Sequence, residues 1–179
     1  MSEIISMEQK RKILKERAKA LASRGKDEKA GGERIAVVEF GLAGERYAVE
    51  SRYVREVLPF RKLALIPCTP SFVLGVIDVR GEILSVIDLG VFFELPRAAA
   101  TPGAKIIVLE STEMELGIAA DVVAGARSIP LEEVSEAPPT LTGVREAYLR
   151  GLAEEDLVIL DAARLLADKS IQVNDEVGP

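Results

Sequence analysis

Short apolar runs rich in β-branched residues recur along the chain from residue 34 onward, and turn residues separate them. Residues 35–40 and 46–49 flank a turn segment at 41–44, which is the signature of a β-hairpin. Similar runs follow at residues 74–79, 83–87, 105–110, 116–120, 125–129 and 157–160. Most connections are too short for a crossover helix of about a dozen residues, so the pattern predicts small barrels or sandwiches instead of βαβ units.

Helical segments are few in this pattern. Short helical turns are predicted at residues 51–54, after Asp88, and at 161–166. Near the N-terminus, residues 6–9 have the form of a capping box, and apolar side chains follow at roughly heptad spacing up to Leu21. This predicts an N-terminal amphipathic helix of about five turns that ends near Gly25. The helix is either an arm that docks on the body or a partner-binding or self-associating element.

The two halves of the chain resemble one another. Four segments of the first half match four of the second in the same order, at offsets between 69 and 76 residues. The matches are 34–39 with 105–110, 47–49 with 116–118, 72–75 with 148–151, and 86–88 with 159–161. They predict a duplicated unit of about 70 residues, and units that small are expected to share a core.

This organisation predicts the domain boundaries. An N-terminal helix and a Gly-rich linker occupy residues 1–33, and a folded domain occupies 34–169. The domain divides into a first half at 34–99 and a second half at 100–169, and residues 170–179 form a tail.

Composition excludes several classes of protein. Histidine is absent and Cys68 is the single cysteine, so Ser-His-Asp and Cys-His catalysis and Cys/His zinc sites are ruled out. Residues 34–179 carry a net charge of −9 and residues 1–33 a net charge of +3, and aromatics make up 4% of the chain with no Trp. An acidic, aromatic-poor body disfavours nucleic-acid binding. No signal peptide or long apolar run is present, which points to the cytoplasm without membrane insertion.

Residues 72–89, with the sequence FVLGVIDVRGEILSVIDL, resemble the central signature of the CheW family of bacterial chemotaxis coupling proteins. Residues 46–49, followed by residues 54–57, resemble the first hairpin and turn of that family. Residues 68–70 resemble its approach to the central strand, and residues 148–152 and 159–161 resemble its closing segment. The resemblance covers roughly residues 34–169, and the order and spacing of these pieces agree with the family.

The resemblance implies a mostly β fold of two small five-stranded SH3-like barrels that share a core, with few short helices. It also implies a noncatalytic cytoplasmic adaptor, without cofactor, that couples the cytoplasmic tips of transmembrane chemoreceptors to the regulatory domain of the histidine kinase CheA. We therefore expect a location at membrane-bound receptor arrays. One alternative is a coupling protein of a separate, non-flagellar chemosensory pathway, and a remote one is a small nucleic-acid-binding barrel.

The resemblance also implies a protein-binding site for receptor and kinase. Its candidate residues are Val54, Glu56, Gly75, Arg80 and Gly81. Plain structural roles compete with this interpretation, because Val54 could be core, Glu56 surface, Arg80–Gly81 a tight turn and Gly75 a point of close backbone approach. We predict that Arg80 and Glu56 form an ion pair on the receptor-facing surface.

Other polar residues receive structural interpretations. Asp78, Glu82 and Asp88 each lie at a different end of the predicted strands. They lack the alternating oxygen ligands of a calcium-binding loop, so we expect a solvated face and no metal. Cys68 has no histidine to activate it, and we expect a buried or unreactive thiol.

Overall fold

The apolar runs of the sequence form strands. A computed structural model of the chain describes residues 32–96, 102–138, 143–154 and 156–171, so the predicted N-terminal helix and nearly all of the linker lie outside the described residues. The described strands are β1 (Arg34–Leu42), β2 (Glu45–Glu50), β3 (Val54–Pro59), β4 (Val73–Val79), β5 (Glu82–Ile87), β6 (Lys105–Glu110), β7 (Glu115–Ala120), β8 (Val122–Pro130), β9 (Val134–Ser135), β10 (Leu149–Ala153) and β11 (Leu157–Leu160). The described helices are η1 (Ser51–Tyr53), α2 (Leu89–Phe92), η2 (Leu131–Glu133), η3 (Val144–Tyr148) and α3 (Ala162–Ala167), the η elements being 3-10 helices.

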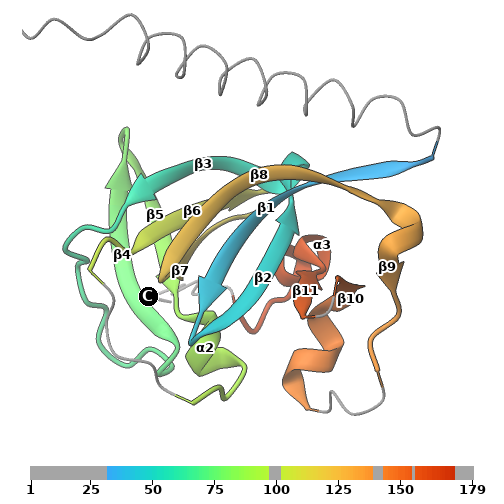
Figure 1. The fold of residues 1–179 in the computed structure, drawn as a ribbon. Coiled ribbons are helices and arrows are strands. Elements are labelled where there is room, and N and C mark those ends of the chain that lie inside the picture. The colour runs from blue at the N-terminus through green and yellow to red at the C-terminus, as the bar shows by residue number, and fades with distance from the viewer. Residues whose placement is uncertain (1–31, 97–101, 139–142, 155, 172–179) are drawn as a thin grey trace, which may run out of the picture. The chain divides into compact units, whose positions relative to one another are not determined.

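The strands form two sheets. Sheet A has the order β8-β1-β2-β11-β10-β9, and sheet B has the order β3-β6-β7-β5-β4 (Figure 1). The fold is therefore mostly β with few short helices, as predicted. Sheet A has six strands instead of five, since η2 separates the two-residue strand β9 from β8.

Each sheet combines strands from both halves of the sequence. The first hairpin, β1–β2, lies in sheet A between β8 and β11 of the second half. The second hairpin, β6–β7, lies in sheet B between β3 and β5 of the first half. The sequence halves 34–99 and 100–169 are thus repeats that exchange hairpins, and neither half contains a complete sheet.

The predicted repeat is present in the strand register. Val86 and Ile87 of β5 pair in parallel with Gly117 and Ile118 of β7. At the equivalent place in sheet A, residues 159 and 160 of β11 pair in parallel with residues 48 and 49 of β2. All four segments matched in the sequence therefore occupy equivalent places in the two sheets.

A common core joins the two sheets, and each sheet also encloses a smaller core of its own. The strand β1 shows how one strand serves two cores. Ile35 and Val37 pack inside sheet A, whereas Phe40 and Leu42 belong to the large cluster between the sheets. The equivalent strand β6 places Ile106 inside sheet B and Ile107 in the shared cluster. The prediction of a shared core is confirmed.

The folded part continues beyond the predicted boundary at residue 169. Ile171 is fully buried in the shared cluster, so the predicted tail at 170–179 contributes at least one residue to the core. A local hydrogen bond explains why the chain turns back toward the core here. The Asp168 side chain accepts the amide hydrogen of Ser170, which stabilises a turn just before Ile171. Among the described residues, no helix is long and apolar enough to cross a membrane.

Candidate functional site

A β-bulge on the edge strand β3 brings two charged side chains together. Val54 pairs with Leu109 and Glu56 pairs with Val108, so Arg55 is an extra residue on β3. A bulge re-aims the side chains around it. Arg55 and Glu56, although adjacent in sequence, both reach the turn that joins β4 to β5. Their side chains are 23% and 17% exposed.

The turn between β4 and β5 presents Arg80. Val79 pairs with Glu82, which leaves Arg80 and Gly81 as a two-residue hairpin loop. Both have positive φ, 57° and 88°, as in the turn type that suits a right-handed twist. Asp78 accepts the amide hydrogen of Gly81 at 2.8 Å. The turn therefore fixes the backbone and leaves the Arg80 side chain 74% exposed.

The predicted ion pair between Arg80 and Glu56 is present. An Arg80 terminal nitrogen lies 3.1 Å from Glu56 Oε2. Arg55 makes parallel contacts to Glu82 at 3.1 Å and to Glu115 of β7 at 2.5 Å. The hydrogen bond that Arg55 donates to Glu82, aided by the negative charge of Glu115, raises the pKa of Arg55. These pairs join β3, one edge of sheet B, to the turn that ends β4, its other edge.

Val54 and Gly75 lie apart from this turn. Val54 is half-buried, packs on the shared core and lines an open pocket of about 270 Å³ between η1 and the β6–β7 turn. Gly75 lies in the middle of β4, where a Cβ would come within 2.4 Å of the Ala64 carbonyl oxygen. The structure therefore brings Glu56, Arg80 and Gly81 together, places Val54 on the same strand as Glu56 but at a separate pocket, and gives Gly75 a packing role.

Sheet A carries a second charged network. Arg127 of β8 contacts Glu39 at 2.9 Å and Glu154 at 2.6 Å. Arg46 of β2 contacts Glu39, Glu154 and Asp156 at 2.8 to 3.1 Å. The hydrogen bonds that Arg46 donates to Glu39 and Glu154 raise the pKa of Arg46, and the hydrogen bond from Arg127 lowers the pKa of Glu154.

The network in sheet A is the counterpart of the pair in sheet B with its charges reversed. Glu56 pairs with Val108, and Arg127 pairs with Val37, the residue that matches Val108 in the repeat. Arg80 and Glu154 both begin the turn after the equivalent strand and both have positive φ. Sequence reasoning missed this second pair, although the repeat offset of 71 residues leads from Glu56 to Arg127.

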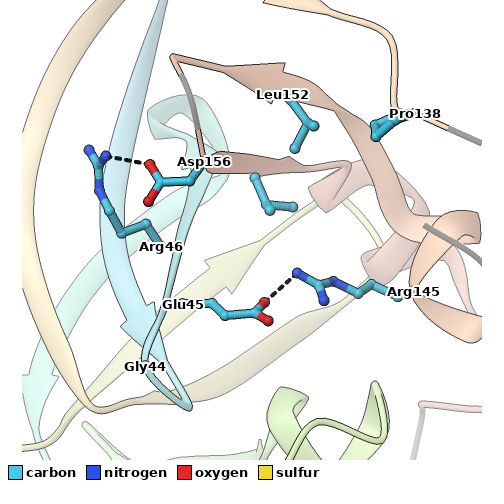
Figure 2. A pocket seen from close by; sticks show the side chains of 8 residues that line it. Gly44, Glu45, Arg46, Pro138, Arg145, Leu152 and Asp156 are labelled. Carbon is cyan, nitrogen blue, oxygen red and sulfur yellow. Dashed lines mark hydrogen bonds and ion pairs between the residues drawn. The ribbon is translucent and has the colours of Figure 1, made fainter. Parts of the chain in front are cut away.

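A further pocket of about 370 Å³ lies beside this network. Figure 2 shows two ion pairs at its wall, Arg46 with Asp156 and Glu45 with Arg145. Leu152, Val158 and Pro138 supply its apolar lining. The charges neutralise one another in pairs, which favours a structural role.

The remaining polar candidates have structural partners. Asp88 accepts the amide hydrogen of Val91 and caps α2. No group of three or more His, Cys, Asp or Glu residues in the described part of the chain is arranged to hold a metal. Of the two alternatives for Cys68, a buried or an unreactive thiol, the buried one is wrong, since the residue lies on an exposed turn after Pro67 with φ at 62°; an unreactive thiol stays a prediction.

Comparisons with known proteins agree with the geometry. The CheW-like domain matches residues 36–170. Chemotaxis protein CheW from Klebsiella aerogenes is 30% identical and covers 77% of this chain and 85% of its own length. Protein FrzA from Myxococcus xanthus is 35% identical, with coverages of 71% and 82%. The crystal structure of the scaffolding protein TtCheW from Thermoanaerobacter tengcongensis superimposes with a TM-score of 0.65 at 30% identity, covering 72% of this chain and 89% of that one.

The domain match spans most of the chain and includes nearly all of the two repeats, the shared core and the exchanged hairpins. The family consists of noncatalytic scaffolds and adaptors of chemosensory signalling. We conclude that the chain belongs to the CheW-like domain family.

Proposed function

We propose that this protein couples the cytoplasmic tips of transmembrane chemoreceptors to the histidine kinase CheA. The observation that carries the proposal is the Glu56–Arg80 pair, which lies at positions that match binding positions of the family. Receptor tips and kinase are on the cytoplasmic side, so the protein would work there. Its mechanism is positioning, because the paired charges fix the geometry of a docking surface and perform no chemistry.

The pair is suited to recognition more than to stability. Arg80 is 74% exposed, so solvent screens its attraction to Glu56, and such pairs contribute about 0 to 1 kcal/mol to folding. A guanidinium held in one orientation presents a fixed fork of donors to a partner, which the ammonium of lysine cannot reproduce. Loss of the pair is therefore expected to weaken assembly without unfolding the protein.

The test is a double-mutant cycle with Arg80→Ala, Glu56→Ala and the double variant. Each single variant should impair receptor-dependent stimulation of CheA while the circular dichroism spectrum stays near wild type. The double variant should lose less than the sum of the two effects, because both changes remove the same interaction. Strict additivity would contradict the pairing, and normal stimulation by Arg80→Ala would contradict the site.

A matched control is Arg164→Ala. Arg164 on α3 is 63% exposed and forms an ion pair with Asp161 at 3.3 Å, so it resembles Arg80 in exposure and pairing. It lies away from the β4–β5 turn, on an element of the second half. This variant should stimulate the kinase normally.

A coupling protein of a separate chemosensory pathway is the second candidate. The observation that favours it is that one of the similar proteins, at 35% identity, carries a name other than CheW, FrzA. Stimulation of one CheA and not another by the purified protein would separate the two candidates.

A further inference from the structure

Arg55 occupies an unusual place in the site. It is the extra residue of the β3 bulge, and its guanidinium is 23% exposed and surrounded by carboxylates from other elements. It contacts Glu115 of β7 at 2.5 Å, Glu82 of β5 at 3.1 Å and Glu56 of its own strand at 3.7 Å. One side chain thus joins three strands of sheet B.

Arg55 contacts Glu56 at the carboxylate oxygen that does not accept a hydrogen bond from Arg80. Glu56 Oε2 accepts from Arg80, whereas Oε1 is buried, has no hydrogen-bond partner and faces Arg55 Nε at 3.7 Å. A buried carboxylate oxygen is costly without a compensating charge. Arg55 supplies a positive charge 3.7 Å from that oxygen, so it opposes rotation of the Glu56 carboxylate toward water.

We propose that Arg55 is a positioning residue that holds Glu56, and through Glu56 the exposed Arg80, in one orientation. The inference rests on the proposed function of the Glu56–Arg80 surface. The Arg55 side chain is 23% exposed, against 74% for Arg80, and its guanidinium is engaged with Glu82 and Glu115, so it acts by holding the bulge in place. A lysine would keep the charge, but it lacks the planar fork needed to join several carboxylates.

The first test needs no partner. In Arg55→Gln, the Nε–H of Arg80 should become more mobile in ¹⁵N relaxation measurements, while backbone amide spectra outside sheet B stay unchanged. Arg55→Lys should give an intermediate result. Unchanged order of the Arg80 Nε–H in Arg55→Gln would overturn the proposal.

Arg46→Gln is the matched control. Arg46 also contacts three carboxylates, but on sheet A, so its loss removes a comparable number of ion pairs at a distance from Arg80. This variant should leave the mobility of Arg80 as in wild type. If both variants mobilised Arg80 equally, the effect would be general destabilisation and the positioning role would be wrong.

The second test measures stimulation of CheA by a receptor cytoplasmic fragment on vesicles. Arg55→Gln should lower stimulation by roughly fivefold, and the addition of Arg55→Gln to Arg80→Ala should cause little further loss, since residues in one network are not additive. Full additivity would overturn the proposal. If wild-type protein failed to stimulate any CheA, the proposed function would be wrong, and the relaxation measurement would still decide the role of Arg55.

Discussion

Two glycines at equivalent places in the repeats allow the backbone to approach closely. A Cβ on Gly75 would lie 2.4 Å from the carbonyl oxygen of Ala64, and one on Gly151 would lie 2.5 Å from that of Ser135. In the first case the approach is part of a bridge, since Val76 and Ala64 exchange two backbone hydrogen bonds of 2.9 Å. Real Cβ atoms do not tolerate such distances, so strands must move if either glycine gains a side chain.

Gly75→Ala and Gly151→Ala should each lower the free energy of unfolding by about 1–3 kcal/mol, because overpacking forces backbone shifts. Gly75→Ala should lower the free energy of unfolding more than Gly151→Ala, since the φ of 139° at Gly75 is also strained for an alanine. The control is Gly81→Ala, where no atom lies within 4 Å and the positive φ alone adds a cost of about 1 kcal/mol. Urea unfolding measures all three. Equal losses at Gly75 and Gly81 would contradict the packing argument.

Tyr148 and Asp168 form a hydrogen bond that ties the segment after α3 to η3. Burial, followed by the bond to Asp168, raises the pKa of Tyr148 to about 12, and the bond from Tyr148 lowers the pKa of Asp168. A raised tyrosine pKa stabilises the fold below about pH 10, and this contribution is lost as the pH rises toward 12. A lowered aspartate pKa stabilises it above about pH 4, and this contribution is lost as the pH falls below that value.

Tyr148→Phe should therefore flatten the dependence of unfolding free energy on pH at both extremes. Thermal or urea unfolding between pH 3 and 5 and between pH 10 and 12 provides the measurement. Some alkaline dependence should persist, because burial also raises the pKa of Tyr47. An unchanged profile in both ranges would show that the Tyr148–Asp168 bond does not contribute.

Two aspartates perform the same task at equivalent elements. Asp88 accepts from the Val91 amide at the start of α2, and Asp161 accepts from the Arg164 amide at the start of α3. The backbone amide of Asp88 donates to the carbonyl oxygen of residue 72, and that of Asp161 donates to the carbonyl oxygen of residue 148, both at 2.8 Å. Residues 72 and 148 are again equivalent in the repeats. Helices of four and six residues gain little from their own hydrogen bonds, so their caps and packing hold them in place.

Asp88→Ala and Asp161→Ala should each lower the free energy of unfolding by about 0.5–2 kcal/mol, the usual cost of losing an N-cap. Asp88→Asn and Asp161→Asn should remain close to wild type, because asparagine caps equally well. Urea unfolding at neutral pH is the measurement. If asparagine and alanine cost the same, the carboxylate charge and not the cap would be responsible.

Local pattern predicted most elements, and failed where a bulge breaks the alternation. The strand β3 was not predicted. Its unpaired residue, Arg55, and the charged Glu56 beside it break the alternation of apolar and polar residues that marks a strand. The start of β8 was expected at Gly125, but the strand begins at Val122 and the register shifts opposite Glu39. The runs without bulges, such as β6 and β11, have the predicted bounds.

The candidate site was predicted in part. The Glu56–Arg80 contact was predicted because the family resemblance supplied both positions. The contact of Arg55 with Glu115 joins residues 60 positions apart, and no periodicity of the sequence indicates such a pair. The exposure of Cys68 was not predicted, because it depends on a turn in which Cys68 has positive φ, and an isolated cysteine does not indicate such a turn.

At the scale of the whole molecule, hairpin exchange makes the repeats dependent on one another. Sheet A needs β1 and β2 from the first repeat, and sheet B needs β6 and β7 from the second. Aromatic side chains of both repeats also pack together in the shared core. Phe40 contacts Tyr47, Tyr47 contacts Phe93, and Phe93 contacts Tyr148 of the second repeat. The molecule should therefore unfold as one cooperative unit.

Fragments 34–99 and 100–171 test this dependence. Each fragment alone should lack a cooperative thermal transition, since it leaves strand edges and core faces unpaired. An equimolar mixture should recover β-type circular dichroism and dispersed amide resonances. A cooperative transition in either isolated fragment would show that a half can form its own barrel.

Hairpin exchange also sets the order in which the chain can fold during synthesis. The hairpin β1–β2 emerges from the ribosome first, yet its neighbours in sheet A are β8, where Arg34 pairs with Pro130, and β11, where Arg46 pairs with Leu157. At roughly 5–20 residues per second, the interval of about 100 residues lasts on the order of 5–20 s. During that time the hairpin would have two open edges, and unpaired strand edges favour aggregation, so synthesis is the stage at which the first half is most exposed to it.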